Sequence, residues 1–447
     1  MAVTGGSAPG TAISTFGAWR PILLLAVGVV LRFAFHALFV PPYEGPDEPA
    51  HLGRVWSFAE EPLAIALRGA ELSGVINAGL LARPCNAGLH ATLGCPEFGR
   101  EKASFGLLRP LPELPPIAAT SNPESNQPPL FYLAAGLLVR VLQRLRGSPR
   151  LSPEEQLLTV RLLCVALVAV AIFGPLRAIA SRRSAGFAVT GLILLALPGA
   201  SESLARCSND AAVFLWAACT MAAIDSAPHP RRLALLMGVG PLLKLTAIPL
   251  VVVMFVVLWR RGSRRSAVLG ALLASLAMPL QLLRGWGWGG TLELNRATPA
   301  FSEPLTVTLV GLARSAYTFV KTAFWLGEWS VFHPPVVLLA AGAGLALLWV
   351  ASARWQGGSD LALAYLVGGL SALLGCALFA LAVRKYWGSW AGIGGWHLWS
   401  WFPWLAVAAG DLLRVNARWR SALIGATAVF CIVSNTVYYQ VASRIYG

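Results

Sequence analysis

The sequence predicts an all-α polytopic membrane protein with about 11 transmembrane helices. Of its 447 residues, 56% are hydrophobic and only 12% are charged, whereas a soluble domain carries about 25% charged residues. The net charge is +15, but the basic residues stand in short clusters between apolar runs. That placement is typical of cytoplasmic loops, so we expect membrane lipids and no nucleic acid as partners.

We expect one transmembrane domain over residues 17–447, preceded by a disordered N-terminus. Residues 1–16 are rich in glycine, serine, threonine and alanine, a composition that cannot bury a core. The first apolar run, 21–40, is long enough to cross a bilayer. We interpret it as a retained anchor, because no cleavage site stands clear of it. With a cytoplasmic N-terminus, the chain after this run lies outside.

The long first outer loop, 41–156, is expected to contain amphipathic interfacial helices. Within it, residues 128–147 could either span the membrane or lie in the interface. Arg140, Gln143 and Arg144 recur at helical spacing and form one polar face, which favours an interfacial helix. If this segment spanned, the later arginine clusters would all move to the outer side, against the positive-inside rule.

Further spans are expected at the later apolar runs. A second outer loop, rich in tryptophan, is expected at 284–330, and its rings suit either an interfacial belt or a sugar-stacking surface. The pair 233–259 is the weakest assignment, because each half is shorter than the roughly 17 residues of a straight span. The expected spans are 157–178, 186–201, 211–226, 233–246, 247–259, 266–283, 331–350, 360–382, 399–413 and 421–439.

An acidic cluster directly after the first span is the main candidate for chemistry. The stretch PPYEGPDEPAH contains Glu44, Asp47 and Glu48, three of only 20 acidic residues in the chain, together with His51. A carboxylate at the boundary of the bilayer can act as a general base or bind a cation. The alternative interpretation is a solvated, proline-rich loop.

A second group of polar residues stands at the start of the span 211–226. Asn209 or Asp210 could cap that helix, a role worth about 1 kcal/mol, but capping does not explain Arg206. An Arg–Asp pair there could hold a phosphate or a cation. Lys244 lies inside an apolar run, where phosphate binding and snorkelling to the interface both remain open.

Other chemistries find no support in the sequence. No HExxH, GxSxG, paired CxxC, Walker A or Rossmann motif stands in a convincing context, which disfavours serine or zinc hydrolysis and the use of cytoplasmic ATP. Cys85 and Cys95 lie in the first loop, and we expect a disulfide between them if that loop is outside the cytoplasm.

The order of several motifs resembles bacterial membrane glycosyltransferases of the GT-C superfamily. The resemblance covers about residues 21–413 and is greatest to an uncharacterised bacterial polytopic family with a PPDE-x-x-H first outer loop. No single motif is specific, but the ordered set is. The motifs are PDEPAH at 46–51, QPPLFYLAAG at 127–136, ARCSND at 205–210, KLTAIP at 244–249 and FWLGEWSVFHPP at 324–335.

This resemblance implies that a sugar moves, with inversion, from a polyprenyl-phosphate carrier to a hydroxyl of a cell-envelope glycan, lipid or protein. The reaction would take place on the outer face of the bacterial cytoplasmic membrane. Asp47 is implied as the general base, with Glu48 second and Glu44 third. No cofactor is certain, and a divalent cation is left open because some relatives use one.

The expected substrate-binding residues come from both ends of the chain. They are His51, Gln127, Arg206, Asn209, Asp210, Lys244 and His397. Many relatives carry a Gly-Arg-Tyr element before a late span, where this chain has Gly395, Trp396 and His397, so the arginine is missing. The alternative function is a transporter or flippase of a lipid-linked glycan. The lack of a convincing internal repeat and the clustering of charges at one boundary favour the enzyme.

Overall fold

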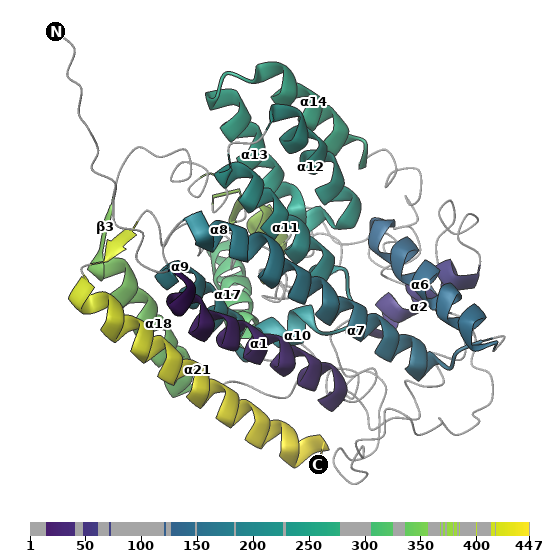
Figure 1. Ribbon diagram of the computed structural model, residues 1–447, viewed down its shortest axis with the longest axis horizontal. Coiled ribbons are helices and arrows are strands. Elements are labelled where there is room, and N and C mark those ends of the chain that lie inside the picture. Colours follow the sequence, from purple (N-terminus) through teal and green to yellow (C-terminus); the bar gives the residue numbers. More distant parts are fainter. Residues whose placement is uncertain are drawn as a thin grey trace.

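The computed structural model shows a helical bundle with two short antiparallel ladders (Figure 1). Strand β1 (Glu71–Leu72) pairs with β2 (Thr120–Ser121), and β3 (Ala353–Trp355) pairs with β4 (Leu413–Val415). The residues that the structure describes are 15–40, 48–60, 71–72, 120–121, 127–147, 150–182, 185–226, 229–277, 305–324, 336–355, 367, 370–371, 373–378, 380–381, 384, 399, 413–415 and 417–446.

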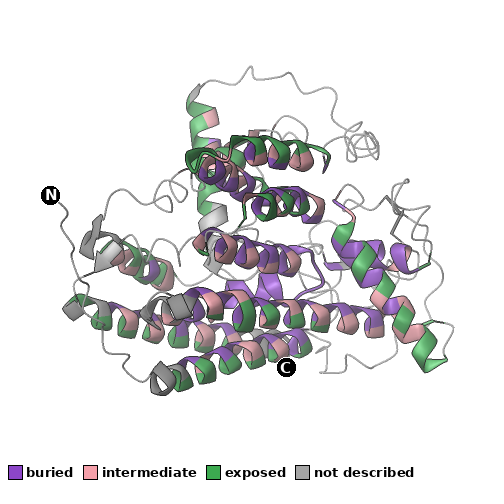
Figure 2. Cartoon of the chain, turned by 45° about the horizontal axis from the view of Figure 1, so that its top comes forward, coloured by how far each residue is buried: buried purple, intermediate pink, exposed green. Residues whose placement is uncertain are grey.

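Helices of very different length make up the bundle. Buried residues concentrate in its centre, and exposed residues lie on the outward faces of the helices (Figure 2). The helices are α1 (Thr15–Phe39), α2 (Glu48–Glu60), α6 (Leu130–Arg146), α7 (Pro153–Ala171), η2 (Ile172–Leu176), α8 (Arg177–Arg182), α9 (Ala185–Leu195), α10 (Pro198–Leu204), α11 (Asp210–Asp225), α12 (Pro230–Leu243), η3 (Leu245–Ala247), α13 (Ile248–Arg260), α14 (Arg264–Ser275), α17 (Leu305–Phe324), α18 (Val336–Ser352) and α21 (Ala417–Tyr446).

Three described helices are long and apolar enough to cross a membrane. They contain Arg20–Phe39, Pro153–Ile179 and Ser421–Gln440, which coincide with three of the predicted spans. Two shorter apolar helices, Leu245–Arg260 and Val336–Trp349, fall on two more of them. A helix of about 20 residues matches the thickness of the bilayer core, so length and composition agree with a helical membrane protein.

The first loop begins and ends at the same end of the bundle. Arg161, in the first half of α7, donates hydrogen bonds to the carbonyls of Ala37 and Val40, where α1 ends. A single crossing by α6 between these two helices would put the start of α7 at the opposite end. The geometry is therefore consistent with the interpretation of 128–147 as a helix that does not span.

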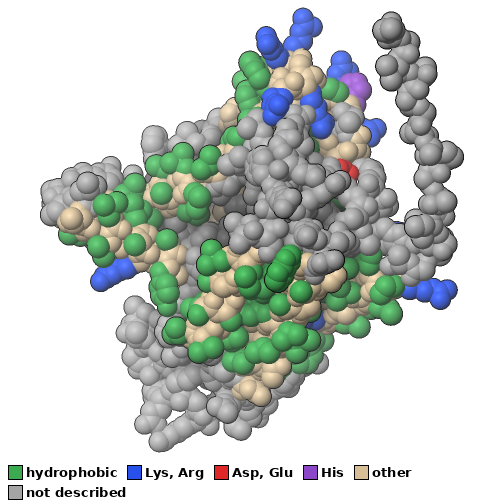
Figure 3. Space-filling view, turned by 90° about the vertical axis from the view of Figure 1, so that its left-hand side faces the viewer, with side chains coloured by type: hydrophobic (Ala, Val, Ile, Leu, Met, Phe, Trp, Pro, Cys, Tyr) green, Lys and Arg blue, Asp and Glu red, His purple; other side chains and the backbone are tan. Residues whose placement is uncertain are grey.

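Helices α12 and α13 form a hairpin that turns at Lys244. This residue has an extended backbone, with φ −164° and ψ 144°, and interrupts the helical run before η3. The arginines at the far end of this hairpin and of α14 are exposed and gather at one end of the molecule, called the basic end below (Figure 3). They are Arg231, Arg232, Arg260, Arg261, Arg264 and Arg265.

Two segments differ from the expected helix pattern. The run expected as a span at 186–201 is divided, because α9 ends at Leu195 and α10 begins at Pro198. Proline lacks an N–H and restricts the residue before it, and Leu197 is accordingly extended. In addition, the 20-residue helix α17 lies within the section 284–330, where only a loop was expected.

Close packing of α2 on α6 depends on Gly136. A Cβ placed on this residue would lie 2.8 Å from Phe58 Cβ and 2.9 Å from the backbone nitrogen of Ala59. We expect Gly136→Ala to destabilise the protein by about 1–3 kcal/mol, as overpacking does. The matched control is Gly28→Ala in α1, where nothing lies within 4 Å of the new Cβ. Equal melting temperatures of the two variants in detergent would contradict this packing.

Candidate functional site

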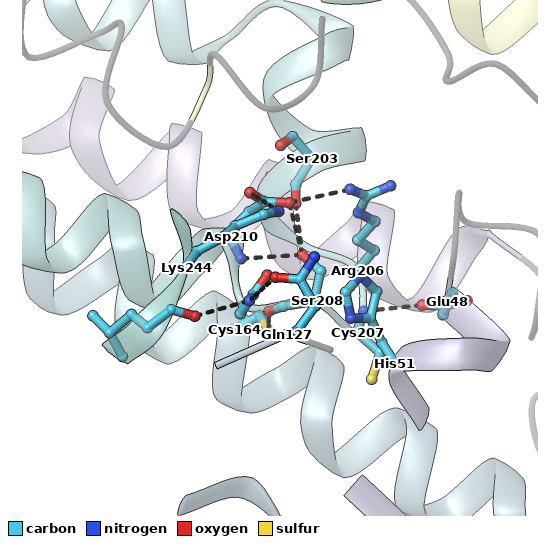
Figure 4. A network of polar contacts seen from close by, with 12 residues as sticks. Glu48, His51, Gln127, Cys164, Ser203, Arg206, Cys207, Ser208, Asp210 and Lys244 are labelled. Carbon is cyan, nitrogen blue, oxygen red and sulfur yellow. Dashed lines mark hydrogen bonds and ion pairs between the residues drawn. The ribbon is translucent and has the colours of Figure 1, made fainter. Parts of the chain in front are cut away.

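A group of buried polar side chains lies where α1 ends and α7 begins. There, the segment between α10 and α11 meets α2 and the turn of the α12–α13 hairpin (Figure 4). Charges inside a protein are costly unless they are paired and hydrogen-bonded, so this concentration calls for an explanation. The buried residues are Glu48, His51, Arg54, Arg161, Arg206, Ser208, Asn209, Asp210 and Lys244.

Glu48 and Arg161 form a two-pronged ion pair between α2 and α7. Arg161 Nε donates to Glu48 Oε1 at 2.8 Å, and Nη2 donates to Oε2 at 2.5 Å. The backbone N–H of Cys207 also donates to Oε1, at 3.0 Å. Because Arg161 Nη1 binds the carbonyls of Ala37 and Val40 as well, this one pair joins the starts of α2 and α11 to α1 and α7.

The surroundings of Glu48 keep its carboxyl ionised. Burial raises the pKa of this group, but the charge and hydrogen bonds of Arg161, the Cys207 N–H and the charge of Arg206 outweigh burial. The net result is a pKa below the ordinary glutamate value of 4.5. Glu48 therefore acts as a fixed anion in this structure, with both oxygens engaged.

This depressed pKa predicts a loss of stability in acid. A carboxyl whose pKa is lower in the folded state than in the unfolded state stabilises the folded state at pH values above its ordinary pKa of 4.5. That contribution disappears as the pH falls from 4.5 through the lowered pKa. We expect the melting temperature in detergent to fall more steeply below that pH in the wild type than in Glu48→Gln, which carries no titrating group there. Parallel curves for the two proteins would show that Glu48 makes no such contribution.

Asp210 bridges two cations from different parts of the chain. Its Oδ1 accepts a hydrogen bond from Lys244 Nζ at 2.7 Å, and its Oδ2 accepts from Arg206 Nη2 at 3.1 Å and from Ser208 Oγ at 3.3 Å. Lys244 comes from the hairpin turn, whereas Arg206 and Ser208 precede α11. The carboxylate thus holds the hairpin turn against the start of α11.

The structure disfavours two of the alternatives that the sequence left open at this point. Asn209 stands at the N-cap position of α11 but makes no side-chain capping bond. Its Nδ2 donates instead to the carbonyl of Leu243 at 2.9 Å and to Gln127 Oε1 at 3.4 Å. Lys244 does not snorkel to an interface, because its ammonium is buried against Asp210. Arg206 and Lys244 both bind the carboxylate of Asp210, which was the other possible cap of the helix.

His51 and Gln127 belong to the same network. His51 Nδ1 and Tyr132 Oη are hydrogen-bonded at 2.6 Å, and their rings are stacked with centroids 5.8 Å apart. The Arg54 guanidinium lies 5.0 Å from the centroid of the Tyr132 ring and donates to the carbonyl of Gln127 at 2.7 Å. The hydrogen bond from the Asn209 amide to Gln127 connects His51, Arg54 and Tyr132 to the segment that contains Asp210.

The structure therefore brings together seven of the predicted site residues: Glu48, His51, Gln127, Arg206, Asn209, Asp210 and Lys244. Glu44, Asp47 and His397, like Cys85 and Cys95, lie outside the described residues. Within the described ranges, no group of three or more His, Cys, Asp or Glu residues is arranged to hold a metal ion.

Three residues of the network were missed in the sequence: Arg54, Tyr132 and Arg161. Arg161 carried a usable signal, because a charge inside an apolar span costs a few kcal/mol and so requires a partner. Tyr132 lies in the motif QPPLFYLAAG but was not singled out. Arg54 could have been found from its position, because it follows His51 by three residues and so shares a helix face with it.

Together, the fold and the site define a helical integral membrane protein with an ionic network buried at one end of its bundle. More specifically, the chain belongs to the DUF2142 family, described as a predicted membrane protein family, whose model matches residues 30–384. No curated protein and no solved structure matches the chain. The matched segment includes the whole network described above and ends before α21.

Proposed function

We propose that the protein is an inverting GT-C-type glycosyltransferase with about 11 spans. It moves a sugar from a polyprenyl-phosphate carrier to a hydroxyl of a cell-envelope glycan, lipid or protein. The hydroxyl oxygen forms a bond to the anomeric carbon while the bond from that carbon to the phosphate oxygen breaks. The hydroxyl proton goes to a carboxylate, and polyprenyl phosphate leaves as an anion.

The observation that carries this proposal is the gathering of buried cations in the network. Its described members include the cations Arg54, Arg161, Arg206 and Lys244, together with the carboxylates Glu48 and Asp210. Fixed cations in a site of low dielectric stabilise a phosphate leaving group as its charge develops. Arg206 and Lys244 come from different elements and would orient that phosphate, with Asp210 fixing both.

We assign the general base to Asp47. Glu48, the second candidate, has both oxygens engaged and a lowered pKa, which makes it a weak acceptor for the proton of a hydroxyl. Asp47 immediately precedes it in the chain. Glu44, the third candidate, is further from the network in sequence, and His397 stays a candidate for binding substrate.

The distribution of arginine supports a site on the outer face of the bacterial cytoplasmic membrane. Six exposed arginines mark the basic end, at the far end of the hairpin from Lys244. Clusters of Lys and Arg favour the cytoplasm, and we therefore propose that the buried network lies on the outer side. The N-terminus of α1 then lies in the cytoplasm, because its C-terminal end contacts Arg161 of the network.

Mass spectrometry of cell-envelope glycans and polyprenyl-phosphate sugars tests this proposal. The comparison is between cells with the protein, cells without it, and cells that carry Asp47→Asn. We expect the sugar donor to accumulate and one glycan to lose a sugar in the last two strains. Identical glycan and donor profiles in all three would overturn the proposal.

A transporter or flippase of a lipid-linked glycan is the second candidate. Two observations favour it: the helical run is interrupted at Lys244, and the terminal nitrogens of Arg32 and the side chain of Glu202 are buried within the bundle. Both are recurrent features of transporters. A transporter would move the lipid-linked sugar across the membrane without releasing polyprenyl phosphate, and that product separates the two functions.

A further inference from the structure

A second buried polar cluster lies between α1, α10 and α21. Arg32 Nε donates to Asn435 Oδ1 at 2.8 Å, which links α1 to α21. Tyr438 Oη donates to Glu202 Oε1 at 3.3 Å, and His36 Nε2 lies 3.7 Å from Glu202 Oε2. These residues form no part of the reaction proposed above, and α21 lies beyond the segment that the family model matches.

Arg32 lacks a counter-ion in this cluster. Both terminal nitrogens of its guanidinium are buried, and neither has a hydrogen-bond partner. Within the described part of the chain, no carboxylate lies at ion-pairing distance from it, and Asn435 supplies only a neutral oxygen. Since arginine stays protonated, a buried guanidinium of this kind is costly unless an anion joins it.

Tyr439 provides a second donor at the same place. Its hydroxyl is buried without a hydrogen-bond partner, and it lies within electrostatic reach of Arg32. The ring is held from one side by Phe35 and Phe39, with centroids 5.5 Å and 5.6 Å away. A guanidinium fork beside a hydroxyl matches the oxygens of a phosphate, to which arginine can bind bidentately.

Glu202 is the carboxylate of this cluster, and its contacts are with Tyr438 and His36. Its carboxylate accepts a hydrogen bond from the Tyr438 hydroxyl and lies 3.7 Å from His36 Nε2. Glu202 forms no ion pair with Arg32, so no described carboxylate balances the charge of the guanidinium. The ligand that completes this cluster is therefore an anion.

The position of Arg32 indicates how such an anion arrives. Arg32 lies about 10 Å along the helix axis from Phe39, because an α-helix rises about 1.5 Å per residue, and so it stands inside the apolar span of α1. Large apolar side chains nearby are exposed on both helices, including Leu31 at 64%, Phe35 at 47% and Ile432 at 65%. They offer a surface for an acyl or prenyl chain.

We propose that Arg32 and Tyr439 bind the phosphate group of a membrane lipid, whose chain lies along α1 and α21. The lipid then neutralises the buried guanidinium and connects the C-terminal helix to α1. This proposal does not depend on the proposed transferase activity, because it uses none of the residues that are assigned to that reaction.

Binding to the purified, delipidated full-length protein tests the proposal. The probes are phosphatidic acid, diacylglycerol as the matched lipid without phosphate, and inorganic phosphate, each added to detergent micelles. We expect phosphatidic acid to raise the melting temperature and to bind at least tenfold more weakly to Arg32→Gln. Diacylglycerol should have no effect. A response to inorganic phosphate equal to that of phosphatidic acid would contradict the lipid as the source.

Two further variants keep the test decisive. Tyr439→Phe removes a single hydroxyl and should weaken phosphatidic acid about threefold to tenfold even if Arg32→Gln folds poorly. Arg265→Gln makes the same change in charge at the exposed basic end and should leave the affinity within about twofold, because surface charges contribute little. Equal affinities for the wild type, Arg32→Gln and Tyr439→Phe would overturn the proposal.

Discussion

Replacing Asp210 with asparagine is expected to destabilise the protein by about 3–5 kcal/mol, the usual cost of removing one partner from a buried ion pair. The carboxylate binds Lys244 at 2.7 Å and Arg206 at 3.1 Å, and all three side chains are buried. Without its charge, two cations would face each other across one neutral amide. Their repulsion would separate the hairpin turn from the start of α11.

The matched control is Asp225→Asn at the other end of the same helix. Asp225 is only half-buried, and an acidic residue near a helix C-terminus is unfavourable to the helix dipole. We therefore expect this substitution to change stability by less than about 1 kcal/mol. Similar melting temperatures for Asp210→Asn and Asp225→Asn in detergent would show that the bridge to Lys244 and Arg206 is not a major source of stability.

Replacing Asp47 with asparagine is expected to slow sugar transfer by about 10²–10⁴-fold, the range that general-base catalysis usually contributes. Asparagine is nearly the same size but cannot accept the proton of the acceptor hydroxyl. The variant should insert and melt like the wild type. Its residual rate would come from the cations that hold the phosphate, which the substitution leaves unchanged.

Glu60→Gln provides a matched control, since Glu60 ends the helix that follows Asp47 and its side chain is 43% exposed. This variant should transfer sugar at the wild-type rate. If Asp47→Asn retained full transfer while the protein remained folded, Asp47 would not be the base. The assignment would then move to Glu44, because both oxygens of Glu48 are engaged.

The sequence was sufficient to predict the membrane class and many members of the buried polar network. Apolar runs longer than about 18 residues fix a spanning helix by length alone, which is why 21–40, 157–178 and 421–439 agree with the structure. Rare charges at the boundaries of such runs have to be paired, so Asp210 and Lys244 were identified as candidates although 34 positions separate them.

Pairings between distant residues could not be predicted in the same way. The bond between Glu48 and Arg161 spans 113 positions and depends on how α2 folds back onto α7. No local sequence pattern predicts that α2 packs against α7. The pairing of Arg32 with Asn435 was not predicted either, because it joins the first and last described helices of the chain.

The capping and snorkelling alternatives for Asn209 and Lys244 show how tertiary partners override local preferences. An Asn before a helix usually caps it, and a Lys near the end of a span usually snorkels. Here, the carbonyl of Leu243 attracts the Asn209 amide, and Asp210 attracts the Lys244 ammonium. Both partners belong to a single contact between the hairpin turn and the start of α11.

The most direct test of the central claim is a transfer assay with the purified protein in vesicles. Polyprenyl-phosphate sugars extracted from membranes serve as donors, with an extract of cell-envelope glycans, lipids and proteins as acceptors. The account predicts that free polyprenyl phosphate and a glycosylated acceptor form in equal amounts, and that Asp47→Asn forms neither. Movement of intact donor across the vesicle membrane without release of polyprenyl phosphate would contradict it.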